Sequence, residues 1–328
     1  MALLEVDDLH IHLRTPRGPA EAVRGVGFSL ERGQTLGIVG ESGCGKSITV
    51  QALMGLLPPA ARVTGNIRFD GRELVGLPER EMCKLRGDRI GMIFQEPMTA
   101  LNPVHTIARQ VAEPLRLHRG LSARAARDEA LQLLERVGIP DAAARLDAYP
   151  HQFSGGQRQR IGIAMALACG PDLLIADEPT TALDVTIQKQ ILELIQGLVA
   201  ERGMSLILIS HDLGVIAQSV SHMLVMYGGT IVESGPTAEV FARRSHPYTQ
   251  GLFAARPALG APRGTRLATI RGSVPELVDL PPGCPFAGRC GFTIEACHAT
   301  RPPPETVGPG HVARCIRLDT VRAAEVAQ

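Results

Sequence analysis

One stretch of this sequence has the residue types and spacing that bind the phosphates of a nucleotide. Gly40-Glu-Ser-Gly-Cys-Gly-Lys46-Ser47 fits the pattern G-x-x-x-x-G-K-[S/T] and lies between an apolar run, 36–39, and a helical pattern, 48–57. Glycines let backbone N–H groups face phosphates, and the helix adds the positive end of its dipole. We expect Lys46 to reach the β- and γ-phosphates and Ser47 to hold Mg²⁺. An ordinary glycine loop is the alternative, which the strand-loop-helix context disfavours. The candidate nucleotide contacts here are Gly40, Glu41, Ser42, Gly43, Cys44, Gly45, Lys46, Ser47 and Ile48.

Two carboxylates follow the apolar run Leu173 to Ala176. The carboxyl end of a buried strand is where an α/β sheet positions its ligands. Asp177 is expected to support Mg²⁺, and Glu178 to orient or activate the attacking water. On their own the two acids are also compatible with a solvated turn, but phosphoryl transfer requires such an acidic partner downstream of Lys46.

A second glycine-containing motif, Phe153-Ser-Gly-Gly-Gln157, precedes a helical pattern from Arg158 to Ala168. Ser154 is a good helix N-cap, and the adjacent glycines allow an anion to approach the helix end closely. Alone, this string indicates only the start of a helix. Together with the phosphate-binding pattern it indicates a nucleotide site.

The elements that must position these residues follow an α/β pattern. Residues 1 to about 95 are strand-rich, and Asp70-Gly71 indicates a tight turn. From Val104 to about Cys169 the pattern is helical, with Leu131, Leu134 and Val137 on one face, which predicts a helical insertion. Apolar runs at 173–176 and 205–209 flank a helical segment, 184–202. This alternation predicts a parallel sheet covered by helices.

Composition excludes several functional classes. The 328 residues carry 34 Lys+Arg and 33 Asp+Glu, and the absence of Trp leaves few aromatic platforms for base stacking. Nucleic acid is therefore disfavoured as a partner. The first eight residues have neither the basic nor the apolar region of a secretory signal, which predicts residence in the cytoplasm. The longest stretch without charge, 213–232, is too polar to span a membrane.

The composition changes near Phe241. Residues 241–328 hold 11 of the 24 prolines and four of the seven cysteines, which predicts a separate C-terminal module with little regular secondary structure. Four thiolates suit an iron-sulfur cluster or a structural zinc, while unligated thiols are the third reading. The absence of a C-x-x-C pair weakens the zinc reading. The four candidate ligands are Cys284, Cys290, Cys297 and Cys315, and the other three cysteines, Cys44, Cys83 and Cys169, are taken as structural.

Residues 3 to about 240 resemble the ATP-binding subunits of ABC transporters, which have a P-loop NTPase core of the α/β class, a β-rich N-terminal subdomain and a helical subdomain. By similarity, the catalytic residues are Lys46, Gln95, Glu178 and His211, and the Mg²⁺ ligands are Ser47, Gln95 and Asp177. The motifs correspond to the Walker A loop (40–47), the Q-loop (Gln95), the signature (Ser154, Gly155, Gly156 and Gln157), the Walker B pair (Asp177 and Glu178), the D-loop (182–184) and the switch histidine (His211).

The tail narrows the resemblance to importers of dipeptides, oligopeptides and nickel. His246-Pro-Tyr-Thr249 followed by a cysteine-rich segment is similar to this group, as are Met98 to Pro103 and Tyr149 to Gln152, so the likeness covers nearly the whole chain. It implies a nucleotide-binding domain at 1–240, with its helical subdomain at about 97–170, and a C-terminal extension at 241–328. Among the open readings of the four cysteines, it favours a 4Fe-4S cluster.

The resemblance also implies partners and a mechanism. ATP bound with Mg²⁺ at one subunit is completed in trans by the signature of a second ABC ATPase subunit, expected to be a paralogue, so that the pair is a heterodimer. Closure of the pair drives two transmembrane permease subunits, which receive solute from an extracytoplasmic binding protein. The chain would then lie on the cytoplasmic face of the plasma membrane and power import of dipeptides or oligopeptides.

Three alternatives remain at this stage. The same ATPase role fits an importer of nickel, haem or another solute. A non-transport ABC ATPase acting on ribosomes or DNA is disfavoured because the chain has one cassette and no basic stripe. A regulatory subunit with a degenerate site is disfavoured because Lys46, Asp177, Glu178 and His211 are all present. One departure from the family is Leu13, which stands where an aromatic residue usually stacks on adenine.

Overall fold

The computed structural model describes residues 2–95, 100–181, 183–255 and 269–326, and the chain divides into two compact units. The first unit comprises Met1–Leu3, Leu30–Thr35 and Asp70–Ile209, and the second comprises Leu4–Ser29, Leu36–Phe69 and Ser210–Gln328. The sequence analysis places a domain boundary near residue 240 because the composition changes there. The two compact units do not divide at this residue, and the boundary stays a prediction.

The first unit contains three parallel strands. β6 pairs with β7, and β7 pairs with β8 in a register that places Asp177 opposite Ile209. Every residue of β7 and β8 is buried, which explains their continuous apolar sequences. The elements of this unit are β5 (Arg72–Glu73), α2 (Glu79–Leu85), β6 (Ile90–Ile93), α4 (Ile107–Arg119), α5 (Ala123–Arg136), α6 (Ala142–Arg145), the 3₁₀ helix η1 (Pro150–Gln152), α7 (Gly155–Leu167), β7 (Leu173–Asp177), α8 (Val185–Arg202) and β8 (Ser205–Ile209).

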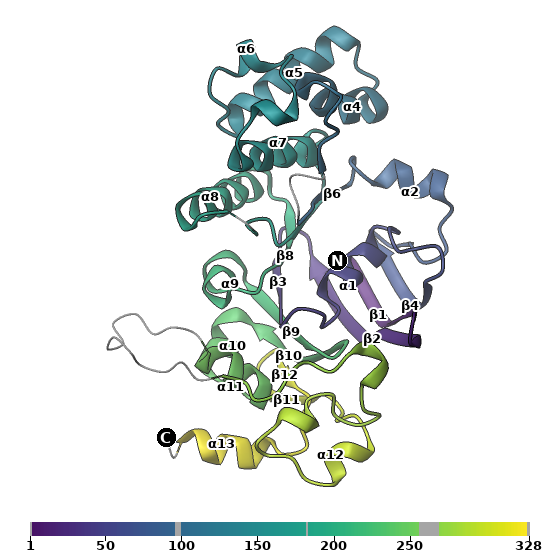
Figure 1. Cartoon of the computed structure of the whole chain (residues 1–328), viewed down its shortest axis with the longest axis vertical. Coiled ribbons are helices and arrows are strands. Elements are labelled where there is room, and N and C mark those ends of the chain that lie inside the picture. The colour runs from purple at the N-terminus through teal and green to yellow at the C-terminus, as the bar shows by residue number, and fades with distance from the viewer. Residues whose placement is uncertain (1, 96–99, 182, 256–268, 327–328) are drawn as a thin grey trace. The chain divides into compact units, whose positions relative to one another are not determined.

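The predicted helical insertion is present. Helices α4, α5, α6 and α7 lie next to one another in this unit (Figure 1). Leu134 and Val137 are buried as predicted, whereas Leu131 is only half-buried and Leu133 takes its place in the core. The face is therefore shifted slightly from the predicted one, within the period of the same helix.

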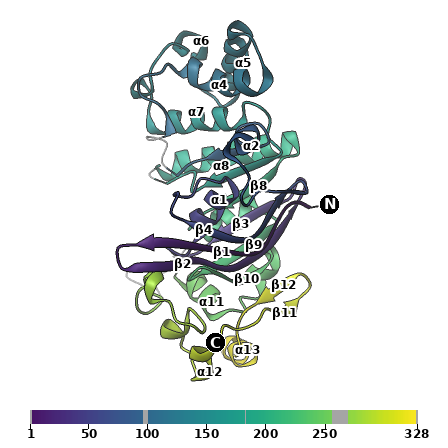
Figure 2. The same ribbon diagram turned by 90° about the vertical axis from the view of Figure 1, so that its right-hand side faces the viewer.

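The second unit contains two groups of strands, with the orders β2-β1-β4 and β11-β12-β10-β9-β3. The long strands β1 and β2 run side by side (Figure 2). β3 pairs with β9 in parallel, and β9 and β10 form an antiparallel hairpin. The elements are β1 (Ala2–Thr15), β2 (Gly18–Glu31), β3 (Thr35–Val39), α1 (Lys46–Leu53), β4 (Arg62–Phe69), α9 (Leu213–Ser219), β9 (His222–Tyr227), β10 (Thr230–Pro236), α10 (Thr237–Ala242), α11 (Pro247–Ala254), η2 (Leu277–Asp279), η3 (Ala287–Arg289), α12 (Ala296–Ala299), β11 (Glu305–Gly308), β12 (His311–Ala313) and α13 (Leu318–Val326).

The proline-rich tail has more regular structure than its composition predicts. Strand β12 pairs with β10, and β11 pairs with β12, so the tail extends a sheet of the second unit (Figure 2). The prediction of little regular structure is wrong for this stretch. Neither β11 nor β12 contains a proline, so every residue of the two strands keeps an N–H group for pairing.

The helices of the described ranges are too short or too polar to cross a membrane. The longest stretch without charge, 213–232, is divided among three elements of the structure. That segment forms α9, β9 and the start of β10.

Candidate functional site

The Walker A loop joins β3 to α1 in the second unit. Gly45 has a φ of 100° and directly precedes α1, so the free N–H groups of the first helical turn open onto the loop. Lys46 is 5% exposed, and its Nζ donates hydrogen bonds to the carbonyl oxygens of Gly40 and Glu41 at 2.9 and 3.1 Å. Ser42 and Gly43 are exposed at the loop tip, where a phosphate can approach the backbone.

Two glycines of this loop are required by close packing. A Cβ atom at Gly40 would lie 2.2 Å from the Met226 carbonyl oxygen, and one at Gly45 would lie 2.9 Å from the Ala22 carbonyl oxygen. Both residues also have positive φ, which disfavours any side chain. The loop therefore fits tightly against the backbone of β2 and the end of β9.

The first unit holds the acidic end of the predicted site. Asp177 ends β7 and is 4% exposed. Glu178 follows with a φ of 45°, a conformation that non-glycine residues rarely adopt. Its Oε2 accepts hydrogen bonds from Gln95 Nε2 at 3.2 Å and from Thr181 Oγ1 at 3.0 Å. Gln95 and Glu178, which lie 83 residues apart, are therefore brought together with the carboxylate held in a fixed orientation.

The signature motif forms the predicted helix start. Ser154 caps α7 by accepting a hydrogen bond from the Gln157 N–H, and the Gln157 side chain accepts from the Ser154 N–H. This reciprocal capping box leaves Ser154 and Gly155 exposed at the helix N-terminus. A Cβ atom at Gly156 would lie 2.9 Å from the Ile187 side chain, so this glycine permits close packing of α7 on α8.

The remaining predicted residues lie in the second unit. His211 is exposed between β8 and α9, directly before Asp212, which caps α9. Leu13 is half-buried on β1. The predicted site residues are therefore divided, with Gln95, Ser154–Gln157, Asp177 and Glu178 in the first unit and Leu13, Gly40–Ile48 and His211 in the second. Residues 96–99 of the Q-loop and Ala182 of the D-loop lie outside the described residues.

Comparison with known proteins identifies the family. Residues 23–181 match the family model "ABC transporter", and residues 232–297 match "Oligopeptide/dipeptide transporter, C-terminal region". The chain is 51% identical to the dipeptide transport ATP-binding protein DppD of Bacillus subtilis, over 95% of this chain and 94% of that protein. It is 49% identical to the oligopeptide transport ATP-binding protein OppD of Salmonella typhimurium, over 96% and 93%. This chain belongs to the ABC transporter ATP-binding proteins.

Solved ABC structures have the same fold. A dimeric ATP-binding cassette in a post-hydrolysis state, bound to ADP and phosphate, matches with a TM-score of 0.64 at 28% identity, covering 71% of this chain and 98% of that one. CbiO1 from Clostridium perfringens matches with a TM-score of 0.62 at 29% identity, covering 74% and 92%. The predicted fold class, membership of the ABC ATPases and ATP-hydrolysing role are confirmed.

This ABC ATPase links its C-terminal segment to the Walker A loop. The Arg289 guanidinium donates hydrogen bonds to both carboxylate oxygens of Glu41, at 2.6 and 3.1 Å, and it is 7% exposed. The Glu41 N–H donates to the Tyr248 hydroxyl at 2.8 Å. Tyr248 belongs to the His246-Pro-Tyr-Thr249 motif and is fully buried. Neither contact is predictable from the sequence, since no local pattern relates residues more than 200 positions apart.

The same segment gathers the four candidate cysteine ligands around one small cavity. Cys284, Cys290, Cys297 and Cys315 all line it, with His246 and Phe286 among the other lining residues. Burial, reinforced by the three neighbouring thiols, raises the pKa of Cys284 to about 11. The four cysteines therefore lie around one cavity, while their predicted role as metal ligands stays a prediction.

The geometry does not show a metal site. Among the residues that the structure describes, no group of three or more His, Cys, Asp or Glu side chains has the arrangement that holds a metal ion. Neither the predicted iron-sulfur cluster nor the alternative of a structural zinc is therefore supported by the described residues. Of the cysteines taken as structural, Cys44 and Cys169 are buried, but Cys83 is exposed, so a packing role does not apply to it.

Proposed function

We propose that this chain is the energy-coupling ATPase of an importer for dipeptides or oligopeptides. The observation that carries the proposal is similarity over nearly the whole chain to DppD and OppD, which includes a separate match of 232–297 to a region typical of peptide transporters. Importers of nickel, haem or another solute remain the alternative. No observation favours an ABC ATPase of ribosomes or DNA.

Residues of the Walker A loop would bind the phosphates of ATP. The Lys46 ammonium lies on the loop carbonyls of Gly40 and Glu41, and from there it would be drawn to the β- and γ-phosphate oxygens by charge. Ser47, Gln95 and Asp177 offer the oxygen ligands that Mg²⁺ prefers. Bound Mg²⁺ would neutralise charge on the phosphates. Leu13 would cover the adenine by apolar contact.

Glu178 would hold the water that attacks the γ-phosphate. Its carboxylate is oriented by hydrogen bonds from Gln95 and Thr181, and a carboxylate held in one orientation can act as general base toward a water. The positive φ of Glu178 is of the kind that recurs at active sites, where surrounding structure maintains the strain. His211 would contact the γ-phosphate as the switch histidine.

The exposed signature start supports pairing with a second ABC ATPase. Ser154 and Gly155 are exposed at the N-terminus of α7, and the positive end of the helix dipole there is suited to an anion supplied by another subunit. We propose that the partner is a paralogue. The pair would act on two permease subunits at the cytoplasmic face of the plasma membrane, with solute delivered by an extracytoplasmic binding protein.

We also propose that the four cysteines hold a 4Fe-4S cluster. They line one cavity although they come from four separate stretches of the tail, and the resemblance to peptide importers favours a cluster at these positions. A four-iron cluster takes one thiolate per iron and spans more space than zinc. Its role would be structural, since ATP-driven transport needs no redox step.

The transport proposal is tested in vesicles that contain this ATPase with its permeases, partner ATPase and binding protein. Uptake of labelled dipeptide, labelled oligopeptide, nickel and haem is compared with ATP supplied inside. ATP-dependent uptake of a peptide supports the proposal. Uptake of nickel or haem without peptide uptake would assign the alternative.

The cluster proposal is tested by metal and sulfide analysis of protein purified without oxygen. About four irons and four sulfides per chain are expected, with both lost when Cys290 or Cys297 is replaced by Ser. The Cys83→Ser variant, at an exposed cysteine outside the group, should retain them. One zinc without iron would replace the cluster, and the absence of both metals would refute ligation.

A further inference from the structure

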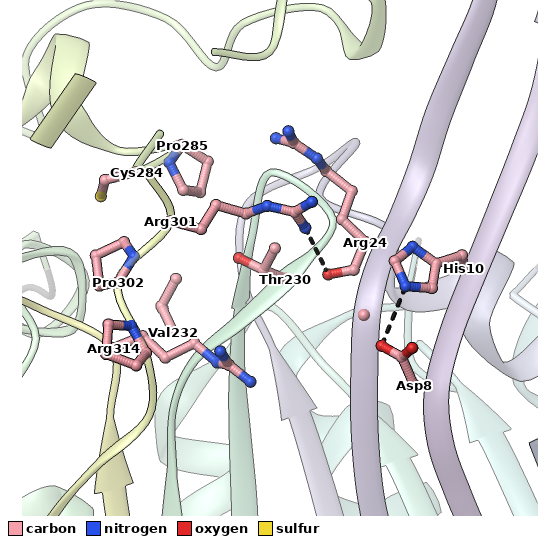
Figure 3. A pocket seen from close by; sticks show the side chains of 12 residues that line it. Asp8, His10, Arg24, Thr230, Val232, Cys284, Pro285, Arg301, Pro302 and Arg314 are labelled. Atoms are coloured by element: carbon pink, nitrogen blue, oxygen red, sulfur yellow. Dashed lines mark hydrogen bonds and ion pairs between the residues drawn. The ribbon is translucent and has the colours of Figure 1, made fainter. Parts of the chain in front are cut away.

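A second cavity of the second unit is rich in arginine. It has a volume of about 300 Å³ and is lined by β1, β2, β10 and the proline-rich tail. Arg301 and Arg314 reach into it from the tail, opposite the strands that carry Arg24 and His10 (Figure 3). Neither the Walker A loop nor the signature contributes a lining residue.

The carboxylates around this cavity do not balance its arginines. Asp8 is the one acidic lining residue, and it pairs with His10 at 3.1 Å. Glu21, close by, pairs with His10 at 2.6 Å and with Arg24 Nε at 3.5 Å. Within the described ranges, neither Arg301 nor Arg314 makes an ion pair with a carboxylate. Of the three arginines that line the cavity, only Arg24 therefore pairs with a carboxylate among the described residues, and that carboxylate also pairs with His10.

Arg24 is an unusual side chain for a protein interior. It is only 8% exposed, and its Nη1 has no hydrogen-bond partner among the described residues. Its Nη2 donates to the Pro281 carbonyl at 3.1 Å, and its own carbonyl accepts from Arg301 at 3.1 Å. Burial, followed by repulsion from Arg301, lowers the pKa of Arg24. An unsatisfied buried donor costs free energy, which an anion at this position would recover.

We propose that this cavity binds the phosphate group of a small molecule. Guanidinium groups donate paired hydrogen bonds to phosphate oxygens, and Arg24, Arg301 and Arg314 supply donors from three positions around the cavity. The volume is at the lower end of the range for small-molecule sites, which suits a single phosphate or a phosphorylated sugar.

Two backbone hydrogen bonds connect this cavity to the Walker A loop. The Arg24 N–H donates to the Gly229 carbonyl at 2.8 Å, and the Gly229 N–H donates to the Cys44 carbonyl at 3.2 Å. Because phosphate also binds the Walker A loop, any test must first fill that loop with nucleotide.

The test uses the full chain saturated with Mg·ADP. Inorganic phosphate is titrated by calorimetry, and thermal unfolding is followed in phosphate and in sodium chloride of equal ionic strength. The proposal predicts saturable binding and a rise of Tm that chloride does not reproduce. Arg314→Gln should weaken phosphate binding at least ~10-fold, because a charge-assisted hydrogen bond is lost. The exposed Arg322→Gln is the matched control and should bind like the wild type.

Further arms identify the source of the phosphate and protect against misfolding. Tighter binding of ribose 5-phosphate than of inorganic phosphate would indicate a phosphorylated metabolite, and equal binding would indicate the free ion. If Arg314→Gln unfolds, Arg301→Gln gives the same comparison. Absence of saturable binding by any phosphate probe, or wild-type affinity in a folded Arg314→Gln or Arg301→Gln variant, overturns the proposal.

Discussion

The Walker A loop and the four-cysteine cavity lie in the same compact unit, yet the chain specifies them in different ways. Eight consecutive residues form the loop, and its shape follows from glycine positions and the start of α1. The cavity is assembled from residues between 246 and 317 that are held by packing around Phe286 and Tyr248. Local spacing therefore determines the first site, and long-range contacts determine the second.

The two sites are joined at Glu41. Its carboxylate pairs with Arg289, which lies between two of the cavity cysteines, and its backbone N–H donates to Tyr248. The Walker A loop, a motif found in many ATPases, is therefore held in this chain by side chains of the family-specific tail. Variants in the loop, in the tail or in the link between them show how much each contributes to ATP hydrolysis, ATP binding and stability.

The largest effect is expected within the ATP-hydrolysing machinery. Replacing Glu178 by Gln keeps the shape of the side chain and removes the charge that we propose activates the attacking water, so turnover should fall at least ~100-fold while ATP binding persists. Steady-state ATPase assays on the assembled transporter measure the first quantity, and nucleotide titration measures the second. Near-normal hydrolysis by this variant would remove Glu178 from the catalytic role.

Breaking the link should destabilise the second unit. Arg289→Ala leaves the partly buried Glu41 carboxylate without its guanidinium, which should lower the free energy of unfolding by about 2–3 kcal/mol. Urea unfolding of the full chain checks this value. The exposed Arg322→Ala is the control and should stay within about 0.5 kcal/mol of the wild type. Equal stability of the two variants would mean that Arg289 does not fasten the tail to the loop.

The free energy of unfolding should depend on pH through His246, a residue of the tail and not of the Walker A loop. Burial lowers the pKa of His246 to about 4, and its Nδ1 accepts a hydrogen bond from the Tyr248 N–H, so the folded protein holds this ring neutral. A histidine in the unfolded chain titrates near pH ~6.5. The stability that comes from keeping His246 neutral is therefore fully present above pH ~6.5 and is lost as the pH falls toward 4.

Between pH 7 and 5, His246 should account for a loss of about 2 kcal/mol of unfolding free energy. The His246→Asn variant keeps an N-cap acceptor for α11 but does not titrate, so its loss over this range should be smaller by that amount. Urea unfolding of both proteins at the two pH values gives the difference. Parallel losses in the two proteins would contradict a neutral buried His246.

The smallest effect is expected at Leu13, where the local motif departs from the family. Leu13→Tyr offers an aromatic ring to the adenine and should tighten ATP binding by up to ~1 kcal/mol. Titration of ATP into both proteins gives the two dissociation constants. An unchanged constant would mean that another residue covers the adenine.

The sequence was sufficient wherever neighbouring residues determine structure. The strands before Gly40 and Glu178, the cap at Ser154 and the helix that begins after Asp184 all form as predicted, because caps, glycines and apolar periodicity act over a few residues. The boundaries shift by a few residues, as at α1, which begins at Lys46 and ends at Leu53.

Other features were beyond sequence reasoning. The Arg289–Glu41 pair and the cavity of Arg24, Arg301 and Arg314 join positions more than 200 residues apart, and each arginine alone has the sequence context of an ordinary surface charge. Strands β11 and β12 were missed because proline composition concealed the short pairing segments. Such features depend on packing between distant elements, which periodicity does not encode.

The central claim is that this chain hydrolyses ATP at its Walker A loop to power transport. The most direct test is ATP hydrolysis by the assembled transporter with wild-type protein and with Lys46→Ala, the partner ATPase being kept catalytically inactive in both. Loss of the Lys46 charge removes its attraction for the phosphates, so phosphate release by the variant should fall to background while the wild type turns over. Equal rates of phosphate release from the two assemblies would contradict the account.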